Sequence, residues 1–302
     1  MINIPGCETF EKIEPINKGW DYENPNNDKK YYIETYDKQR LLLRIANLSE
    51  YENKKAQFDM LEQLSKVDIP MPYPIGFGLC NDGKNVYQLF TWVNGEDLES
   101  LLPTMSEADQ YHFGLKAGNL LKLIHSIPAP EGTDDWIISF STMLHEEIDT
   151  YQANTLLHCK SGEIIIEYFI NNKNILSVQP QTFIHGDYNP GNLIIMPNNE
   201  LGVIDFSCGY GDPYWDIFKV SWRPTMYSHF YSGQIRGYTC EPSLEFWKIY
   251  THYFAYGALL ALRAPQWAGF NDLEEGRRTA QDILKWSDNL TNPIPTWYLD
   301  EQ

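Results

Sequence analysis

The sequence predicts an α+β protein in which a small antiparallel sheet with one helix precedes a larger, mainly helical part. Two observations predict this fold class. Up to about residue 93, short apolar runs alternate with turn residues, which is typical of antiparallel strands. Beyond it, apolar residues recur mostly at the three- and four-residue spacing of helices. The turn at residues 94–95 (Asn-Gly) is the predicted junction, which divides the chain into residues 1–93 and 94–302.

The first part contains five predicted strands and one helix. After the first strand, residues 24–28 lengthen a turn because they favour loops. The helix is expected to begin after Ser49, an N-cap candidate with Glu52 three residues later, and to end near Lys66. A hairpin turn is predicted at residues 81–84 (Asn-Asp-Gly-Lys). The predicted strands are 10–15, 30–35, 40–45, 75–80 and 85–90.

The second part is predicted to be helical outside a group of short strands. Its first helix opens at Ser106, and its last is amphipathic. The run of isoleucines within residues 163–171 would also suit a strand, but its length and setting favour a helix. The predicted helices are 106–125, 136–157, 163–171, 244–263 and 272–286.

Residues 183–206 are the most informative segment of the chain. They consist of an apolar strand, a polar loop, a second strand, a turn at residues 197–199 and a third strand ending in Asp205. The loop carries Asp187 and, five positions later, Asn192, the spacing of a protein-kinase catalytic loop. Phosphoryl transfer needs one carboxylate to accept a hydroxyl proton, and hard oxygen ligands to hold magnesium on the nucleotide phosphates. The alternative is an ordinary hairpin with polar turn residues.

With His185-Gly186-Asp187, Asn192 and Asp205 in this context, the chain resembles the aminoglycoside phosphotransferase family of small-molecule kinases. The resemblance implies a protein-kinase-like fold of two lobes: a nucleotide-binding lobe (1–93) and a helical lobe (94–302) that contains the catalytic hairpins and the substrate site. It also implies that Asp187 is the catalytic base, that Asn192 and Asp205 bind Mg²⁺, and that ATP or GTP is the phosphate donor.

Three neighbouring residues are expected to support the catalytic loop. The resemblance implies that His185 orders it by hydrogen bonding, although a packed core histidine is the alternative. Asp216 is expected to brace the loop rather than touch substrate. His125, at the end of a predicted helix, is expected to be a packing residue.

The resemblance also assigns nucleotide-binding residues in the first lobe. Arg44 stands where the family places its phosphate-gripping base, and a guanidinium can fork onto phosphate oxygens. Gln57 falls where the family usually has a glutamate that pairs with this base, and its amide can bond to Arg44 without neutralising it. Gly19 would let the backbone approach the phosphates closely. Backbone groups that read the purine edge are expected at Thr91, Trp92 and Val93, which leaves ATP and GTP equally possible.

The formal net charge of −18 disfavours nucleic acids and anionic membranes as partners. It is compatible with a cationic substrate such as an aminoglycoside, because a negative field concentrates cations, but it could also serve solubility alone. Substrate recognition is expected from carboxylates and aromatic rings of the helical lobe, each of which could equally be a solvated or packing residue. The candidates are Asp134, Asp135, Glu146, Trp222, Trp267 and Glu274, together with the adjacent Trp136, Glu147 and Glu275.

Several alternatives stay open at this point. The acceptor could be another small alcohol, such as a macrolide, choline, homoserine or methylthioribose. Gln57 and the irregular phosphate loop mildly favour a nucleotide-binding pseudokinase, whereas the intact Asp187, Asn192 and Asp205 argue against it. A protein kinase is disfavoured because residues 205–216 are too short for an elaborate activation segment.

The remaining features of the sequence concern location and assembly. The five cysteines lack C-x-x-C spacing, so neither a disulfide framework nor a zinc site is predicted. The first residues do not resemble a secretion signal, and apolar runs such as residues 255–262 are too short to span a bilayer. A cytoplasmic monomer or homodimer is expected, and a role in antibiotic resistance stays open.

Overall fold

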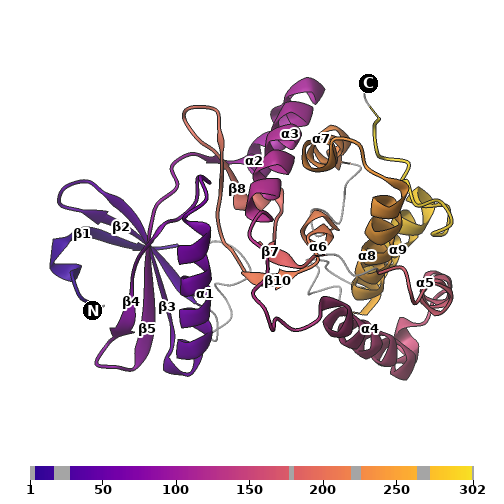
Figure 1. Cartoon of the computed structure of the whole chain (residues 1–302), viewed down its shortest axis with the longest axis horizontal. Coiled ribbons are helices and arrows are strands. Elements are labelled where there is room, and N and C mark those ends of the chain that lie inside the picture. Colours follow the sequence, from indigo (N-terminus) through magenta and orange to yellow (C-terminus); the bar gives the residue numbers. More distant parts are fainter. Residues whose placement is uncertain (1–3, 17–27, 177–179, 219–225, 264–272, 301–302) are drawn as a thin grey trace. The chain divides into compact units, whose positions relative to one another are not determined.

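The computed structural model describes residues 4–16, 28–176, 180–218, 226–263 and 273–300 (Figure 1). The chain forms two compact units. The first comprises Met1–Asp97 and Asn192–Cys208, and the second comprises Leu98–Gly191 and Gly209–Gln302. The first unit therefore contains the predicted nucleotide-binding lobe and also the hairpin that follows the catalytic loop.

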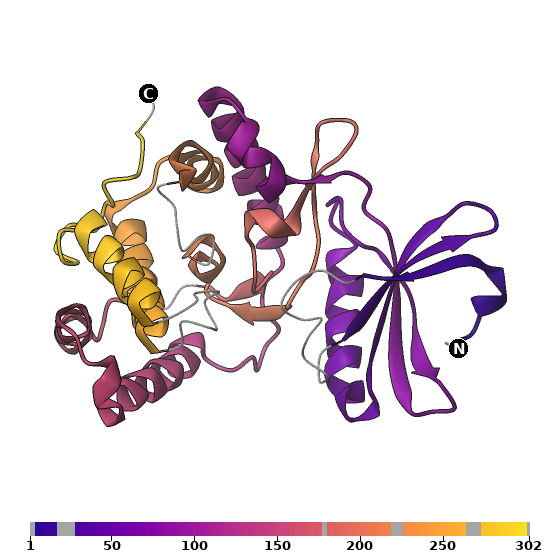
Figure 2. The same cartoon turned by 180° about the vertical axis from the view of Figure 1, so that it is seen from behind.

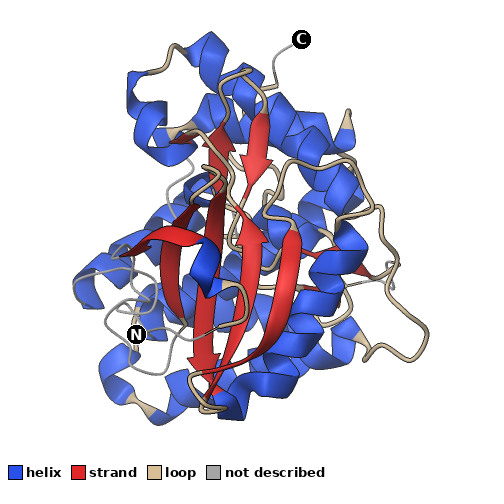
Figure 3. Cartoon of the chain, turned by 90° about the vertical axis from the view of Figure 1, so that its left-hand side faces the viewer, coloured by secondary structure: helices blue, strands red, loops and turns tan. Residues whose placement is uncertain are grey.

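A five-stranded antiparallel sheet forms the body of the first unit (Figure 3). Its strand order is β1-β2-β3-β5-β4. Consecutive strands pair as β1–β2, β2–β3 and β4–β5, whereas β3 pairs with β5 instead of with β4. All five predicted strands are confirmed. Ile33, Leu41, Leu43 and Ile45 fill its core because alternate residues of β2 and β3 face inward. The strands are β1 (Phe10–Pro15), β2 (Lys29–Thr35), β3 (Arg40–Asn47), β4 (Pro74–Cys80) and β5 (Asn85–Thr91).

Helix α1 (Tyr51–Leu64) packs on this sheet through an apolar face that includes Phe58, Leu61 and Leu64 (Figure 1). Phe58 contacts the rings of Phe77 on β4 and Phe90 on β5. The predicted capping box is wrong. Ser49 lies in a 3₁₀ turn, η3 (Leu48–Glu50), and the Tyr51 N–H bonds to the Leu48 carbonyl, so the tight turn rather than a serine side chain satisfies the start of the helix.

A three-stranded antiparallel sheet completes the first unit. It consists of β6 (Glu96–Asp97), β8 (Leu193–Ile195) and β9 (Leu201–Val203), in the order β6-β8-β9. The predicted third strand of the catalytic hairpin ends at Val203 rather than at the aspartate. The Val203 N–H donates to the Pro70 carbonyl, which ties this sheet to the segment before β4.

The second unit is mainly helical, around the buried helix α8, in which every residue from 249 to 259 is buried. Its helices include all five predicted ones, although α4 ends at Ala153 rather than at residue 157, and α2, α6 and α7 are additions. Strand β7 (Thr182–Ile184) precedes the catalytic hairpin and β10 (Gly209–Gly211) follows it, and the two form a short antiparallel pair. The helices are α2 (Leu98–Leu101), α3 (Glu107–Ile124), α4 (Trp136–Ala153), α5 (Lys160–Asn171), α6 (Tyr214–Phe218), α7 (Ser228–Thr239), α8 (Leu244–Arg263) and α9 (Leu273–Trp286).

Helices α3 and α7 lie side by side at very short range (Figures 1 and 2). A Cβ at Gly114 would lie 2.1 Å from the Phe230 carbonyl oxygen, and one at Gly233 would lie 2.3 Å from that of Tyr111. Gly118 and Gly237 repeat the pattern one turn further along. The two backbones can pack this closely only because these positions carry no side chain.

The observed architecture confirms the α+β, protein-kinase-like fold class, with an antiparallel sheet and one helix in the first unit and a helical second unit. Among the residues that the structure describes, no helix is both long and apolar enough to cross a membrane.

Candidate active site

Asp216, on α6, holds the start of the catalytic loop. One carboxylate oxygen accepts the His185 N–H at 2.6 Å, and the other accepts the Gly186 N–H at 2.8 Å. His125 Nε2 lies 3.0 Å from the first oxygen. Gly186 has φ +83, a left-handed conformation that favours glycine. The expectation that Asp216 braces this loop agrees with these bonds.

The charge state of Asp216 follows from the same contacts. Complete burial alone would raise its pKa, because a buried carboxylate loses its hydration. The hydrogen bond with His125 and the Gly186 N–H help to outweigh that effect, so the pKa of Asp216 is lowered from 3.8. The brace is therefore anionic.

Asp187 is exposed between two buried anchors. Its own N–H donates to His185 Nδ1 at 3.1 Å, and His185 is fully buried. On the other side, the fully buried Tyr188 donates its hydroxyl to the Ala117 carbonyl on α3 at 2.7 Å. The backbone around Asp187 is thus held on both sides by hydrogen bonds that involve buried neighbours.

His125 has more than the packing role expected of it. This buried residue caps the end of α3, and its Nδ1 lies 2.9 Å from the Tyr238 hydroxyl while its Nε2 faces Asp216. It therefore links α3 and α7 to the brace. No sequence signal connected it to Asp216, because the two residues are 91 positions apart.

A second buried carboxylate, Asp212, has the opposite pKa shift. Burial raises the pKa of Asp212, and the bonds from the Tyr253 hydroxyl (2.7 Å) and the Tyr214 N–H (2.8 Å) offset this only in part. The Trp136 indole donates to the same hydroxyl at 2.8 Å. Trp136, considered with the substrate candidates, therefore has a structural partner inside the second unit.

The predicted metal ligands follow the pairing of β8 with β9. Asn192 comes directly before β8, and Asp205 comes shortly after β9. The Ile204 N–H donates to the Asn192 carbonyl at 2.9 Å, so the two residues lie at the same end of this antiparallel pair. Asp205 has φ +58. Lys30 Nζ lies 2.7 Å and the Arg44 guanidinium 3.5 Å from its carboxylate oxygens, so two basic side chains balance the charge of Asp205 in this structure. An amide and a carboxylate with hard oxygens suit magnesium.

The partner of Arg44 differs from the expected one. The Arg44 guanidinium bonds to Asp28, with Nε and a terminal nitrogen 2.9 and 2.8 Å from the same oxygen. Gln57 instead accepts from Lys54 Nζ at 3.3 Å. The reason is physical, since a carboxylate forms a stronger, charge-assisted bond to a guanidinium than a neutral amide does. Asp28, Lys30 and Lys54 were missed because the sequence assigns the first to a turn and the others to ordinary strand and helix positions.

At the predicted hinge, two backbone donors are engaged inside the first unit. The Thr91 N–H donates to the Tyr73 carbonyl at 2.9 Å, and the Trp92 N–H donates to the Arg40 carbonyl at 3.1 Å. The purine-reading role of Thr91, Trp92 and Val93 stays a prediction, and these two N–H groups would have to exchange partners to serve it.

Comparison with known proteins decides the family. The model of the phosphotransferase enzyme family (APH) matches residues 12–249, which is most of the chain. The chain belongs to this family. The resemblance to aminoglycoside phosphotransferases is thereby confirmed.

Solved structures share the fold of this family member at low sequence identity. APH(2″)-IIa in complex with gentamicin is 16% identical with a TM-score of 0.62, over 94% of this chain and 97% of that one. ADP-bound aminoglycoside phosphotransferase APH(2″)-Ib is 15% identical with a TM-score of 0.60, over 96% and 95%. The amicoumacin kinase hAmiN, in complex with AMP-PNP, Ca²⁺ and Ami, is 15% identical with a TM-score of 0.59, over 94% and 90%. No curated protein matches the sequence.

Several substrate candidates of this phosphotransferase have structural partners of their own among the described residues. Asp135 caps α4 by accepting from the Ile137 and Ile138 N–H groups, because aspartate side chains satisfy helix starts well. Glu146 is exposed on α4, and Glu274 pairs with Arg277 at 2.5 Å on α9. Glu147 is buried in an ion pair with Arg263. Gly19, Trp222 and Trp267 lie outside the described residues.

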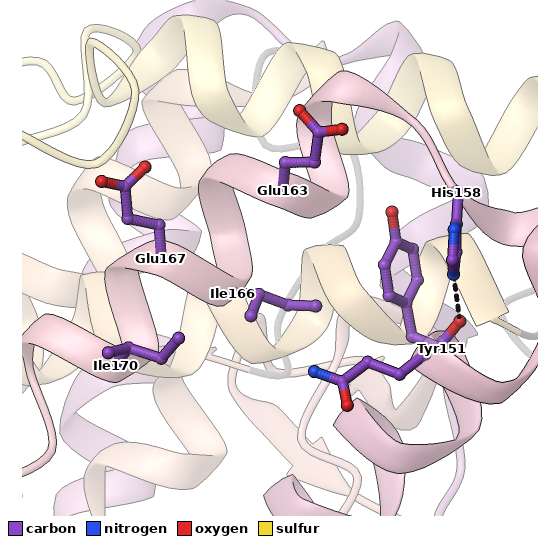
Figure 4. Close-up of a pocket in the computed structure, with 7 residues that line it drawn as sticks. Tyr151, His158, Glu163, Ile166, Glu167 and Ile170 are labelled. Carbon is purple, nitrogen blue, oxygen red and sulfur yellow. Dashed lines mark hydrogen bonds between the residues drawn. The ribbon is translucent and has the colours of Figure 1, made fainter.

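An open pocket of 490 Å³ lies where the end of α4 meets α5 (Figure 4). His158 stacks on Tyr151 with ring centroids 5.1 Å apart, and Glu163 and Glu167 follow one face of α5. None of the predicted site residues that the structure describes lines this pocket. The residues that line it are Tyr151, Gln152, His158, Glu163, Ile166, Glu167 and Ile170.

Proposed function

We propose that this family member transfers the γ-phosphoryl group of ATP or GTP to a hydroxyl of a small, cationic molecule of the aminoglycoside type. The observation that supports this most is the presentation of Asp187. Its carboxylate is exposed on a backbone that His185 and Tyr188 hold from both sides and that Asp216 braces. A general base needs such a fixed position within reach of the proton it accepts.

Each residue has a distinct task in this proposal. Asp187 accepts the proton of the acceptor hydroxyl as the hydroxyl oxygen attacks phosphorus. Arg44 stabilises the negative charge of the phosphate oxygens. Asn192 and Asp205 hold magnesium, which neutralises charge on the phosphates when it is bound. Asp216 keeps the loop in place through its bonds to residues 185 and 186.

The nature of the acceptor rests on charge and on relatives. A chain with net charge −18 attracts cations, and related solved structures include a gentamicin complex and an amicoumacin kinase. We further propose that the protein acts in the cytoplasm, where both nucleotide and magnesium are available. A macrolide, choline, homoserine or methylthioribose as acceptor is an alternative outcome of the test below.

The test is release of ADP or GDP by the full chain with magnesium and a panel of aminoglycosides, macrolides and small metabolic alcohols. Asp187→Asn is the matched variant, because it keeps the shape of the side chain and removes the base. Release that depends on an acceptor and disappears in Asp187→Asn supports the proposal. If nucleotide binds but no acceptor stimulates release in any class, the protein is a nucleotide-binding module and the proposed transfer is wrong.

A further inference from the structure

Three basic side chains and two carboxylates of the first unit form one connected network of ion pairs. Lys30 on β2 and Arg44 on β3 are directly opposite each other in the antiparallel pair, so their side chains share one face of the sheet. Both reach the Asp205 carboxylate, at 2.7 and 3.5 Å. Lys54 on α1 joins the network through Asp28.

Asp28 is the centre of this network. One of its oxygens accepts from two nitrogens of Arg44, at 2.9 and 2.8 Å, and lies 2.9 Å from Lys54 Nζ. Its side chain is only 7% exposed, and that of Lys54 is 11% exposed. A single buried oxygen therefore fixes the distance between a strand guanidinium and a helix ammonium.

The backbone of α1 is fixed at the same point. Gln88 on β5 is the cross-strand neighbour of Arg44, and its side-chain amide donates to the Lys54 carbonyl at 2.9 Å. The Gln57 amide oxygen accepts from Lys54 Nζ at 3.3 Å. The position of the Lys54 ammonium is thus defined by the sheet, by the helix and by Asp28.

The basic side chains of the network share their carboxylates. Arg44 and Lys54 both pair with Asp28, and Lys30 and Arg44 both pair with Asp205. Three basic groups are thereby held close together on one side of the first unit. The more exposed end of the network is Asp205, at 35%. An anion with several charged oxygens, such as a nucleoside diphosphate or triphosphate, matches this set of donors.

Building on the proposed function, we propose that Asp28 is the positioning carboxylate of the nucleotide-phosphate site and that Lys30 and Lys54 bind phosphate together with Arg44. The family resemblance implies a carboxylate on the helix that pairs with the strand base. In this chain the helix supplies a second base, and the carboxylate comes from the residue directly before β2.

The substitution Asp28→Asn separates two explanations because they predict opposite changes. If Asp28 acted only through its negative charge, removing that charge would strengthen the binding of an anion. If Asp28 positions Arg44 and Lys54, the substitution releases the Arg44 guanidinium and the Lys54 ammonium and weakens ADP binding. Each lost phosphate contact of about 1.4 kcal/mol lowers the affinity tenfold. The probe is ADP without metal, titrated calorimetrically into the full chain. Asp59→Asn removes the same charge from the exposed Lys55 pair on α1 and serves as the control.

Further variants keep the test decisive. Lys54→Met retains the aliphatic stem and is expected to weaken ADP binding about tenfold, and Asp28→Glu is expected to recover part of the affinity lost in Asp28→Asn. Urea unfolding reports whether each variant folds, and if Asp28→Asn does not, Lys54→Met carries the test alone. Unchanged or tighter ADP binding in Asp28→Asn or Lys54→Met overturns the inference and leaves the proposed function standing. A wild-type chain that binds neither ADP nor GDP overturns both.

Discussion

Replacement of Asp216 by asparagine tests the brace of the catalytic loop. The wild-type carboxylate accepts from the His185 and Gly186 N–H groups at 2.6 and 2.8 Å and faces His125 Nε2 at 3.0 Å. An asparagine has the same shape but only one acceptor oxygen. Its amide nitrogen would face a buried donor, so at least one of these three bonds is lost and one donor is left without a partner.

The expected cost follows from those contacts. Losing one bond to a charged group costs about 1.5–3 kcal/mol, and leaving a buried donor unsatisfied costs about 1–3 kcal/mol. Breaking a buried pair by removing one partner costs about 3–5 kcal/mol in other proteins. We therefore expect Asp216→Asn to lower the free energy of unfolding by about 3–5 kcal/mol.

Urea unfolding measures this loss, with Asp149→Asn on the exposed face of α4 as the control for the change in charge. The pKa of Asp216 is lowered, so its stabilising contribution is present above its ordinary pKa of 3.8 and is lost as the pH falls further. The difference between wild type and Asp216→Asn should therefore shrink as the pH falls below 3.8. An unfolding midpoint equal to that of the control would refute the reasoning.

Two further predictions concern the second unit. Gly233→Ala places a methyl 2.3 Å from the Tyr111 carbonyl oxygen and should lower the free energy of unfolding, measured in urea, by about 3 kcal/mol. As the control, Gly76→Ala should change stability far less, because the nearest atom to its methyl is 3.7 Å away. Equal effects of the two substitutions would contradict the close packing of α3 and α7. Burial lowers the pKa of His252 from 6.5 to about 4, so neutral His252 stabilises the fold above 6.5 and this contribution is lost as the pH falls toward 4. Between about pH 7 and pH 5, wild type should lose about 2 kcal/mol more than His252→Phe, and parallel pH profiles would be the opposing result.

Local patterns were sufficient for much of the fold. Helix α8 has the predicted bounds because its apolar residues surround the whole helix, and the five strands of the first sheet alternate clearly. The catalytic loop was also readable from sequence, since Asp187 and Asn192 stand at a fixed spacing between apolar strands. These features depend on neighbours within a few residues.

Features that depend on distant partners were missed. Helix α7 is rich in Ser, Gly and Tyr, which are mediocre helix formers, and its packing on α3 compensates for that. Asp28 lies in a segment that reads as a turn, yet it binds residues 16 and 26 positions later. Asp135 looked like a ligand for a cation but caps a helix. Each case requires knowledge of which surface the residue meets in the folded chain.

The most direct test of the central claim is detection of a phosphorylated product. An acceptor that stimulates nucleotide turnover is incubated with ATP or GTP, magnesium and the full chain, and the acceptor is analysed by mass spectrometry. The account predicts that it gains one phosphoryl group with the wild-type chain and none with Asp187→Asn, while both chains bind nucleotide equally. Undiminished product formation by Asp187→Asn would contradict the assignment of Asp187 as the base, and with it the proposed mechanism.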